Sequence, residues 1–148
     1  MKQEVIYELD EQGRQFSRDW VTSRSRLWRR IFLDAGVEPG TDLQGIPADF
    51  EPILDGVSAV RGIEIGVLEG RSACWFAEHL LGHPESRLIA IDPSSDHHAR
   101  LVAQNLGQTP NGRRVEFIRQ CSNDAFTTVA AQRLAELAPF DFAYIDGC

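Results

Sequence analysis

From residue 60 onward, short apolar runs alternate along the chain with segments that have helical spacing. The apolar runs are Gly62–Val67, Arg87–Asp92, Arg114–Arg119 and Phe140–Asp146, and the helical segments are Ser72–Leu81, His98–Leu106 and Asp124–Leu137. Short runs rich in branched and aromatic residues, bounded by Gly and Pro, are typical of buried strands. Strands that alternate with helices favour a parallel sheet with right-handed crossovers. The pattern therefore predicts an α/β protein with a Rossmann-like, doubly wound parallel sheet, incomplete at about four strands.

The first part of the chain follows another pattern. Residues Met1–Asp10 carry few apolar groups and are expected to form a loose arm. Phe16, Trp20, Leu27 and Ile31 then recur at helical spacing, and a loop rich in Gly and Pro follows. We therefore expect two regions, a helical lead-in with a loop over 1–57 and a Rossmann-like half-domain over 58–148.

Composition and charge limit the classes of protein to which this chain can belong. The chain has 148 residues, of which 43% are hydrophobic and 25% charged, as expected for one globular domain. A net charge of −7 argues against a nucleic-acid partner. No apolar run is long enough to span a membrane, and the first residues do not resemble a signal peptide. The three cysteines are far apart and odd in number, which favours reduced thiols and a cytoplasmic location.

The stretch from Arg61 to Ser72 holds the candidate binding loop. An apolar strand leads into Glu64-x-Gly66-x-x-x-Gly70, after which the helical pattern begins. A strand, a tight turn and a helix N-terminus place backbone N–H groups against a bound anion. Leu68 stands where the dinucleotide fingerprint has the glycine that lets the chain approach a pyrophosphate. A ligand with a carboxylate and no pyrophosphate, such as S-adenosylmethionine, suits this loop better.

Four more candidates lie in or after the predicted strands. Glu64 is a charge in an apolar strand, so it needs either a cationic ammonium or a neighbouring arginine. Asp92 follows the second strand, where an acid accepts hydrogen bonds from ribose hydroxyls or caps the following loop. Ser122 either lines an adenine pocket or caps a helix. Asp146 precedes Gly147 and either faces the cleft or belongs to an ordinary turn.

In these motifs the chain resembles the class I S-adenosylmethionine-dependent methyltransferases, and among them the O-methyltransferase-like members. The motifs are Glu64–Ser72, Ala90–Asp92 and Phe140–Gly147. The resemblance implies that Glu64, Gly66, Gly70 and Ser72 hold the methionine end of the cofactor and that Asp92 holds its ribose. It places Ser122 near the adenine and Asp146 near the reacting methyl or a divalent metal such as Mg²⁺. Family members commonly continue as Asp-Gly-x-His, whereas this sequence stops at Cys148.

Three functions follow as alternatives. The first is methyl transfer to an oxygen of a small-molecule acceptor, with this chain carrying the cofactor-binding half and Asp146 as the catalytic residue. The second is a nicotinamide-dependent oxidoreductase, which the strand–helix–strand pattern and Asp92 favour and Leu68 opposes. The third is a non-catalytic module that binds a partner. The N-terminal helix and the open sheet edge are the surfaces expected to form any homo-oligomer.

Overall fold

The computed structural model describes residues 7–17 and 58–146. The chain divides into two compact units, Met1–Asp55 and Gly56–Cys148. Each unit is described by itself below.

The described part of the first unit is a β-hairpin. Strand β1 (Tyr7–Leu9) pairs antiparallel with β2 (Gln15–Ser17). Asp10 holds the turn, because its carboxylate accepts hydrogen bonds from the backbone N–H of Arg14 at 2.9 Å and from its Nε at 2.6 Å. Gly13 adopts a φ of 75°, which favours glycine.

The hairpin corrects two sequence predictions. The expected loose arm over residues 1–10 is wrong at Tyr7–Leu9, and the expected start of a helix at Phe16 is wrong because Phe16 and Ser17 belong to β2. The Asp and Gly of the turn, set between short alternating runs, are hairpin signals that outweigh the helical spacing of Phe16 with later residues. The rest of the predicted lead-in lies outside the described residues.

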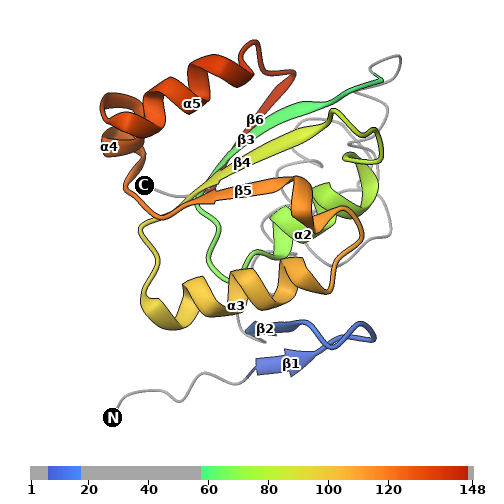
Figure 1. Ribbon diagram of the computed structural model, residues 1–148. Helices are drawn as coiled ribbons and strands as arrows, with labels where there is room; N and C mark the ends of the chain where they lie inside the picture. The colour runs from blue at the N-terminus through green and yellow to red at the C-terminus, as the bar shows by residue number, and fades with distance from the viewer. Residues whose placement is uncertain (1–6, 18–57, 147–148) are drawn as a thin grey trace, which may run out of the picture. The chain divides into compact units, whose positions relative to one another are not determined.

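The second unit is a four-stranded parallel sheet with helices, shown in Figure 1. The strands lie in the order β5-β4-β3-β6, and all three pairings are parallel. The predicted α/β, Rossmann-like class is therefore confirmed. In chain order the elements are β3 (Arg61–Ile65), α2 (Arg71–His79), β4 (Arg87–Ile91), α3 (Asp96–Gly107), the 3₁₀ helix η2 (Gly112–Arg114), β5 (Val115–Ile118), α4 (Ser122–Thr127), α5 (Val129–Leu137) and β6 (Phe142–Ile145).

The strand register brings the ends of three strands to one level. Ile65 at the end of β3 lies opposite Ile91 of β4 and Ile145 of β6. Because the strands are parallel, the residues that follow them, Gly66, Asp92 and Asp146, emerge at the same edge of the sheet. Ligands of open α/β sheets bind beyond this carboxyl edge.

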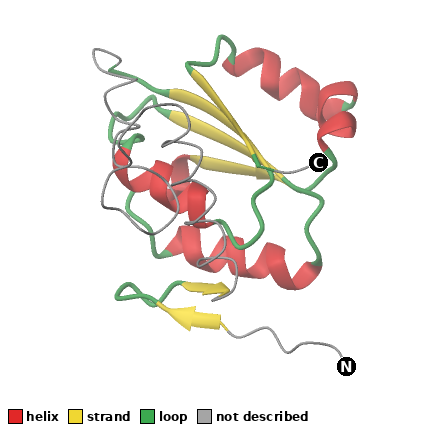
Figure 2. Ribbon diagram, turned by 180° about the vertical axis from the view of Figure 1, so that it is seen from behind, coloured by secondary structure: helices red, strands yellow, loops and turns green. Residues whose placement is uncertain are grey.

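Helices cover both faces of the sheet, with α2 and α3 on one side and α4 and α5 on the other (Figures 1 and 2). On the α2 side, the fully buried Phe76 contacts Phe142, with ring centroids 5.0 Å apart, and Tyr144 at 5.4 Å. Burying such a side chain contributes about 1.5–3 kcal/mol. On the α4 and α5 side, isoleucines of β3 and β4 pack against helix residues, namely Ile63, Ile89, Ile91, Ala125, Leu134 and Leu137.

One predicted helix is two. The pattern over 124–137 predicts a continuous helix, but α4 ends at Thr127 and α5 begins at Val129. Thr128 between them has an extended backbone, with φ −111° and ψ −162°. Three β-branched residues in succession lower helix propensity here, which explains the break. Among the described residues, no helix is both long enough and apolar enough to cross a bilayer.

Candidate functional site

The turn between β3 and α2 has the backbone that its glycines permit. Gly66 and Gly70 have φ angles of 89° and 81°, which strain residues that carry a Cβ. Leu68 also has a positive φ, 51°, although it is not a glycine. The turn is tied to the sheet because the Gly66 N–H donates to the Ile91 carbonyl at 2.9 Å. The predicted strand, turn and helix N-terminus are thus all present, with Gly70 as the N-cap of α2.

Glu64 is a carboxyl group inside the core. It is 0% exposed, and its Oε1 accepts a hydrogen bond from the Ser72 hydroxyl of α2. Its Oε2 has no hydrogen-bond partner in the described part of the chain. No ion pair to an arginine is present there either, so the arginine alternative is not realised among these residues. Burial, with smaller contributions from Asp146 and Asp92, raises the pKa of Glu64 from 4.5 to about 8 against the lowering effect of Ser72.

Asp92 connects the loop after β4 to the glycine turn. Its Oδ2 accepts hydrogen bonds from the backbone N–H of Val67 at 2.8 Å and of Leu68 at 3.3 Å. Its Oδ1 accepts a hydrogen bond from the Ser94 hydroxyl. The loop-capping alternative is therefore part of its role. The bonds to the turn were not expected from the sequence, since they join residues 25 and 24 positions apart.

Asp146 and Ser122 lie at the same edge of the sheet as the glycine turn. Asp146 is half-buried and follows β6, and its N–H donates to the Ile65 carbonyl at 2.8 Å. Ser122 is the first residue of α4, and Cys121 occupies the N-cap position without a side-chain cap. The N-cap alternative for Ser122 is therefore wrong. Its expected place near an adenine stays a prediction, as does the orientation of Asp146 toward a methyl group.

The carboxyl edge of the sheet is strongly acidic. Glu64, Asp92 and Asp146 come from three adjacent strands, and both aspartates act electrostatically on Glu64. Such a cluster favours a ligand that carries positive charge. Within residues 7–17 and 58–146, no group of three or more His, Cys, Asp or Glu side chains is arranged to hold a metal ion. The described residues therefore offer no ready site for the divalent metal.

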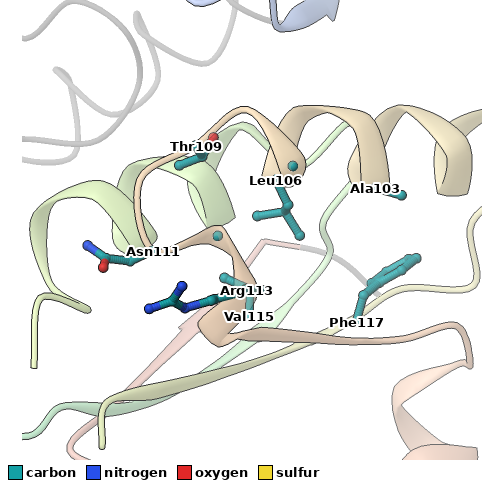
Figure 3. A pocket seen from close by; sticks show the side chains of 9 residues that line it. Ala103, Leu106, Thr109, Asn111, Arg113, Val115 and Phe117 are labelled. Atoms are coloured by element: carbon teal, nitrogen blue, oxygen red, sulfur yellow. The ribbon is translucent and has the colours of Figure 1, made fainter. Parts of the chain in front are cut away.

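A hollow of about 610 Å³ lies elsewhere in this unit, between α3, η2 and β5. Figure 3 shows the apolar side chains of Leu106, Val115 and Phe117 around it, together with the polar side chains of Asn111 and Arg113. Its lining includes none of the residues predicted to bind a cofactor. The volume of a hollow is thus a poor guide here, and the backbone geometry and the buried carboxyl group at the carboxyl edge point to the site.

Two supporting residues were missed from the sequence. Asn105 of α3 is fully buried, and its Nδ2 donates to the Glu69 carbonyl within the glycine turn at 2.8 Å. Ser94 is buried and orients Asp92. A polar residue on the apolar side of a predicted helix was the available signal for Asn105. Ser94 had only the general turn preference of serine after proline.

Fold and site together define a Rossmann-like α/β domain whose glycine turn and acidic strand ends suit a cationic nucleoside cofactor. A model of the methyltransferase domain matches residues 63–148. The chain therefore belongs to this methyltransferase-domain family, within the class I S-adenosylmethionine-dependent methyltransferases. The resemblance to methyltransferases inferred from the motifs is confirmed.

The chain is also similar to proteins of known structure. Cofactor-bound Rv0187 from MTB is 26% identical, with a TM-score of 0.53, over 83% of this chain and 53% of that one. The O-methyltransferase TomG from Streptomyces achromogenes, involved in tomaymycin synthesis and solved in complex with S-adenosylmethionine, is 22% identical, with a TM-score of 0.49, over 96% of this chain and 56% of that one. The chain thus spans about half the length of these proteins. A comparison with curated proteins gave no match.

Proposed function

We propose that the protein binds S-adenosylmethionine at the carboxyl ends of β3, β4 and β6 and transfers its methyl group to an oxygen of a small-molecule acceptor. The observation that carries the proposal is Glu64, which is fully buried beside the glycine turn and has one carboxyl oxygen without a partner in the described part of the chain. Leaving a buried polar atom unpaired costs free energy. A cationic donor from the cofactor would recover that cost.

The methionine end would be held by the turn between β3 and α2. In this proposal Glu64 accepts a hydrogen bond from the ammonium group through Oε2, while Ser72 keeps Oε1 occupied. Gly66 and Gly70 let the backbone turn so that N–H groups near the start of α2 face the cofactor carboxylate. The partial positive charge at the helix N-terminus adds to the attraction.

The nucleoside end would be held by the next two strand ends, with Asp92 binding the ribose and Ser122 lying near the adenine. The Asp92 carboxylate has about four acceptor positions, of which three are filled by Val67, Leu68 and Ser94. One ribose hydroxyl can use the remaining position. A second would replace the weakest existing bond, the 3.3 Å one from Leu68.

When bound, S-adenosylmethionine supplies a methyl group already activated by its positively charged sulfur. What the chain must add is alignment of the acceptor and removal of its proton. We assign the proton to Asp146: as the new O–CH₃ bond forms and the S–CH₃ bond breaks, the carboxylate takes up the hydroxyl hydrogen. Oxygen as the accepting atom belongs to this proposal, and so does a cytoplasmic location.

Isothermal titration of the protein with S-adenosylmethionine and S-adenosylhomocysteine tests the proposal. We expect both to bind, and Gly66→Ala to weaken binding at least tenfold because the Cβ strains a turn with φ 89°. Gly107→Ala is the matched control, since a Cβ there meets no atom within 4 Å, and it should bind like the wild type. A folded protein that binds neither ligand would overturn the proposal.

The accepting atom needs a separate assay. Transfer of a labelled methyl group to hydroxylated aromatic compounds is compared with transfer to the matching amines. We expect label only in the hydroxylated series, and loss of that transfer in Asp146→Asn with cofactor binding retained. Label in the amines alone would contradict the choice of oxygen.

A further inference from the structure

Arg119, the first residue after β5, reaches across to the loop that follows β4. Its Nε donates to the Ser94 carbonyl at 2.6 Å, and its Nη1 pairs with Asp96 Oδ1 at 2.6 Å. The side chains of this ion pair are 46% and 77% exposed, so the pair by itself contributes little to stability. Ser94, by contrast, is only 6% exposed. The contact therefore fixes a buried part of the loop from outside.

Ser94 passes this constraint on to Asp92. Its carbonyl is held by Arg119, and its hydroxyl donates to Asp92 Oδ1. The other oxygen of Asp92 is held by the glycine turn. A chain of hydrogen bonds thus runs from the end of β5, through the loop after β4, to the turn after β3. It crosses three neighbouring strand ends at the edge where the cofactor is proposed to bind.

We propose that Arg119 is a positioning residue for the ribose of the cofactor. It holds the backbone of Ser94 so that the serine hydroxyl fixes the orientation of the Asp92 carboxylate. In this orientation one acceptor position stays open for a ribose hydroxyl. This inference rests on the proposed function, because it assigns Asp92 to the ribose. Preorganised acceptors bind a ligand more tightly because less motion is lost on binding. If Arg119 only anchored a loop, its loss would instead weaken the binding of cofactors with and without ribose hydroxyls equally.

The experiment compares two ligands by titration: S-adenosylhomocysteine and its analogue that lacks both ribose hydroxyls. Arg119→Gln should weaken S-adenosylhomocysteine about tenfold, the loss of roughly one charge-assisted hydrogen bond, and the analogue less than twofold. Arg113→Gln is the matched control, since this exposed arginine lies just before β5 and has no hydrogen bond or ion pair to the other described residues. It should change neither affinity.

Ser94→Ala provides a second route that leaves Arg119 intact and should produce the same selective loss. The double variant should lose no more than the worse single variant, because the two residues act in series. If Arg119→Gln does not fold, Arg119→Lys and Ser94→Ala carry the test. Equal weakening of both ligands, or no weakening, would overturn the inference while the proposed function stands. A wild-type protein that binds neither ligand would instead refute the proposed function.

Discussion

Glu64 is the residue whose surroundings are hardest to explain by folding alone. A carboxyl group with no exposed surface and one oxygen lacking a partner in the described structure is destabilising in its charged form. Its pKa of about 8 means that the folded protein without a bound cation holds a proton there at neutral pH, and an ammonium group at Oε2 would displace that proton. Such a loss of stability is typical of functional sites, and it fits a carboxyl group whose role is to bind a cation.

The shifted pKa sets a pH dependence of stability. The carboxyl pKa is higher in the folded state than in the unfolded one, so the folded state binds the extra proton between about pH 4.5 and 8. The free energy of unfolding that depends on Glu64 is therefore highest below that window and falls as the pH rises through it. Glu64→Gln cannot ionise, so it should be more stable than the wild type by a few kcal/mol at pH 8.5 and nearly equal at pH 4.5.

Urea unfolding at pH 4.5, 6.5 and 8.5 measures this difference. Glu85→Gln, which removes an exposed carboxyl between α2 and β4, is the control and should follow the wild type at every pH. If the Glu64→Gln and wild-type curves stay parallel across the window, the buried carboxyl does not take up a proton on folding.

At the scale of elements, the pairing of β3 with β6 depends on a glycine, which has no side chain to collide with the neighbouring strand. Gly62 of β3 lies opposite Phe142 of β6, and a Cβ added to Gly62 would overlap the Phe142 ring. The ring lies over the glycine and also contacts Phe76 of α2. A single glycine therefore lets a strand, its neighbour and a helix pack together.

Gly62→Ala should destabilise the protein by about 1–3 kcal/mol, because the added methyl overpacks a filled site. Replacing Phe142 with leucine in the same protein should recover part of this loss by making room. Chemical unfolding of both single variants and the double variant gives the coupling. Gly107→Ala, which adds its methyl to open space, should leave stability unchanged or slightly higher. Strictly additive losses would show that the two residues do not compete for one space.

At the scale of the whole unit, the sheet gathers its acids at one edge. A bound cofactor stabilises the folded state by mass action. At a concentration one hundred times its Kd, S-adenosylhomocysteine should add about 2.7 kcal/mol, which raises the Tm of a protein of this size by about 5–10 °C. NADH should cause no shift, because Leu68 replaces the glycine that admits a pyrophosphate. Thermal melts with each ligand measure both effects; a shift with NADH alone would favour the oxidoreductase alternative.

Much of the fold and part of the site were accessible from local pattern. The four strands of the second unit and the turn at Gly66 and Gly70 follow from apolar runs and from glycines at positions of positive φ. The hairpin at residues 7–17 was missed because its strands are only three residues long. The break at Thr128 was missed because the apolar spacing continues across it.

The sequence by itself determined where strands and helices alternate in the second unit and, to within one or two residues, where each of its strands ends, since both depend on neighbours along the chain. The tertiary structure alone decided the strand order β5-β4-β3-β6, the complete burial of Glu64 and the hydrogen bonds that link Arg119, Ser94 and Asp92 to the glycine turn. These features join residues far apart in the chain. Their strength depends on distance and burial, which no local pattern records.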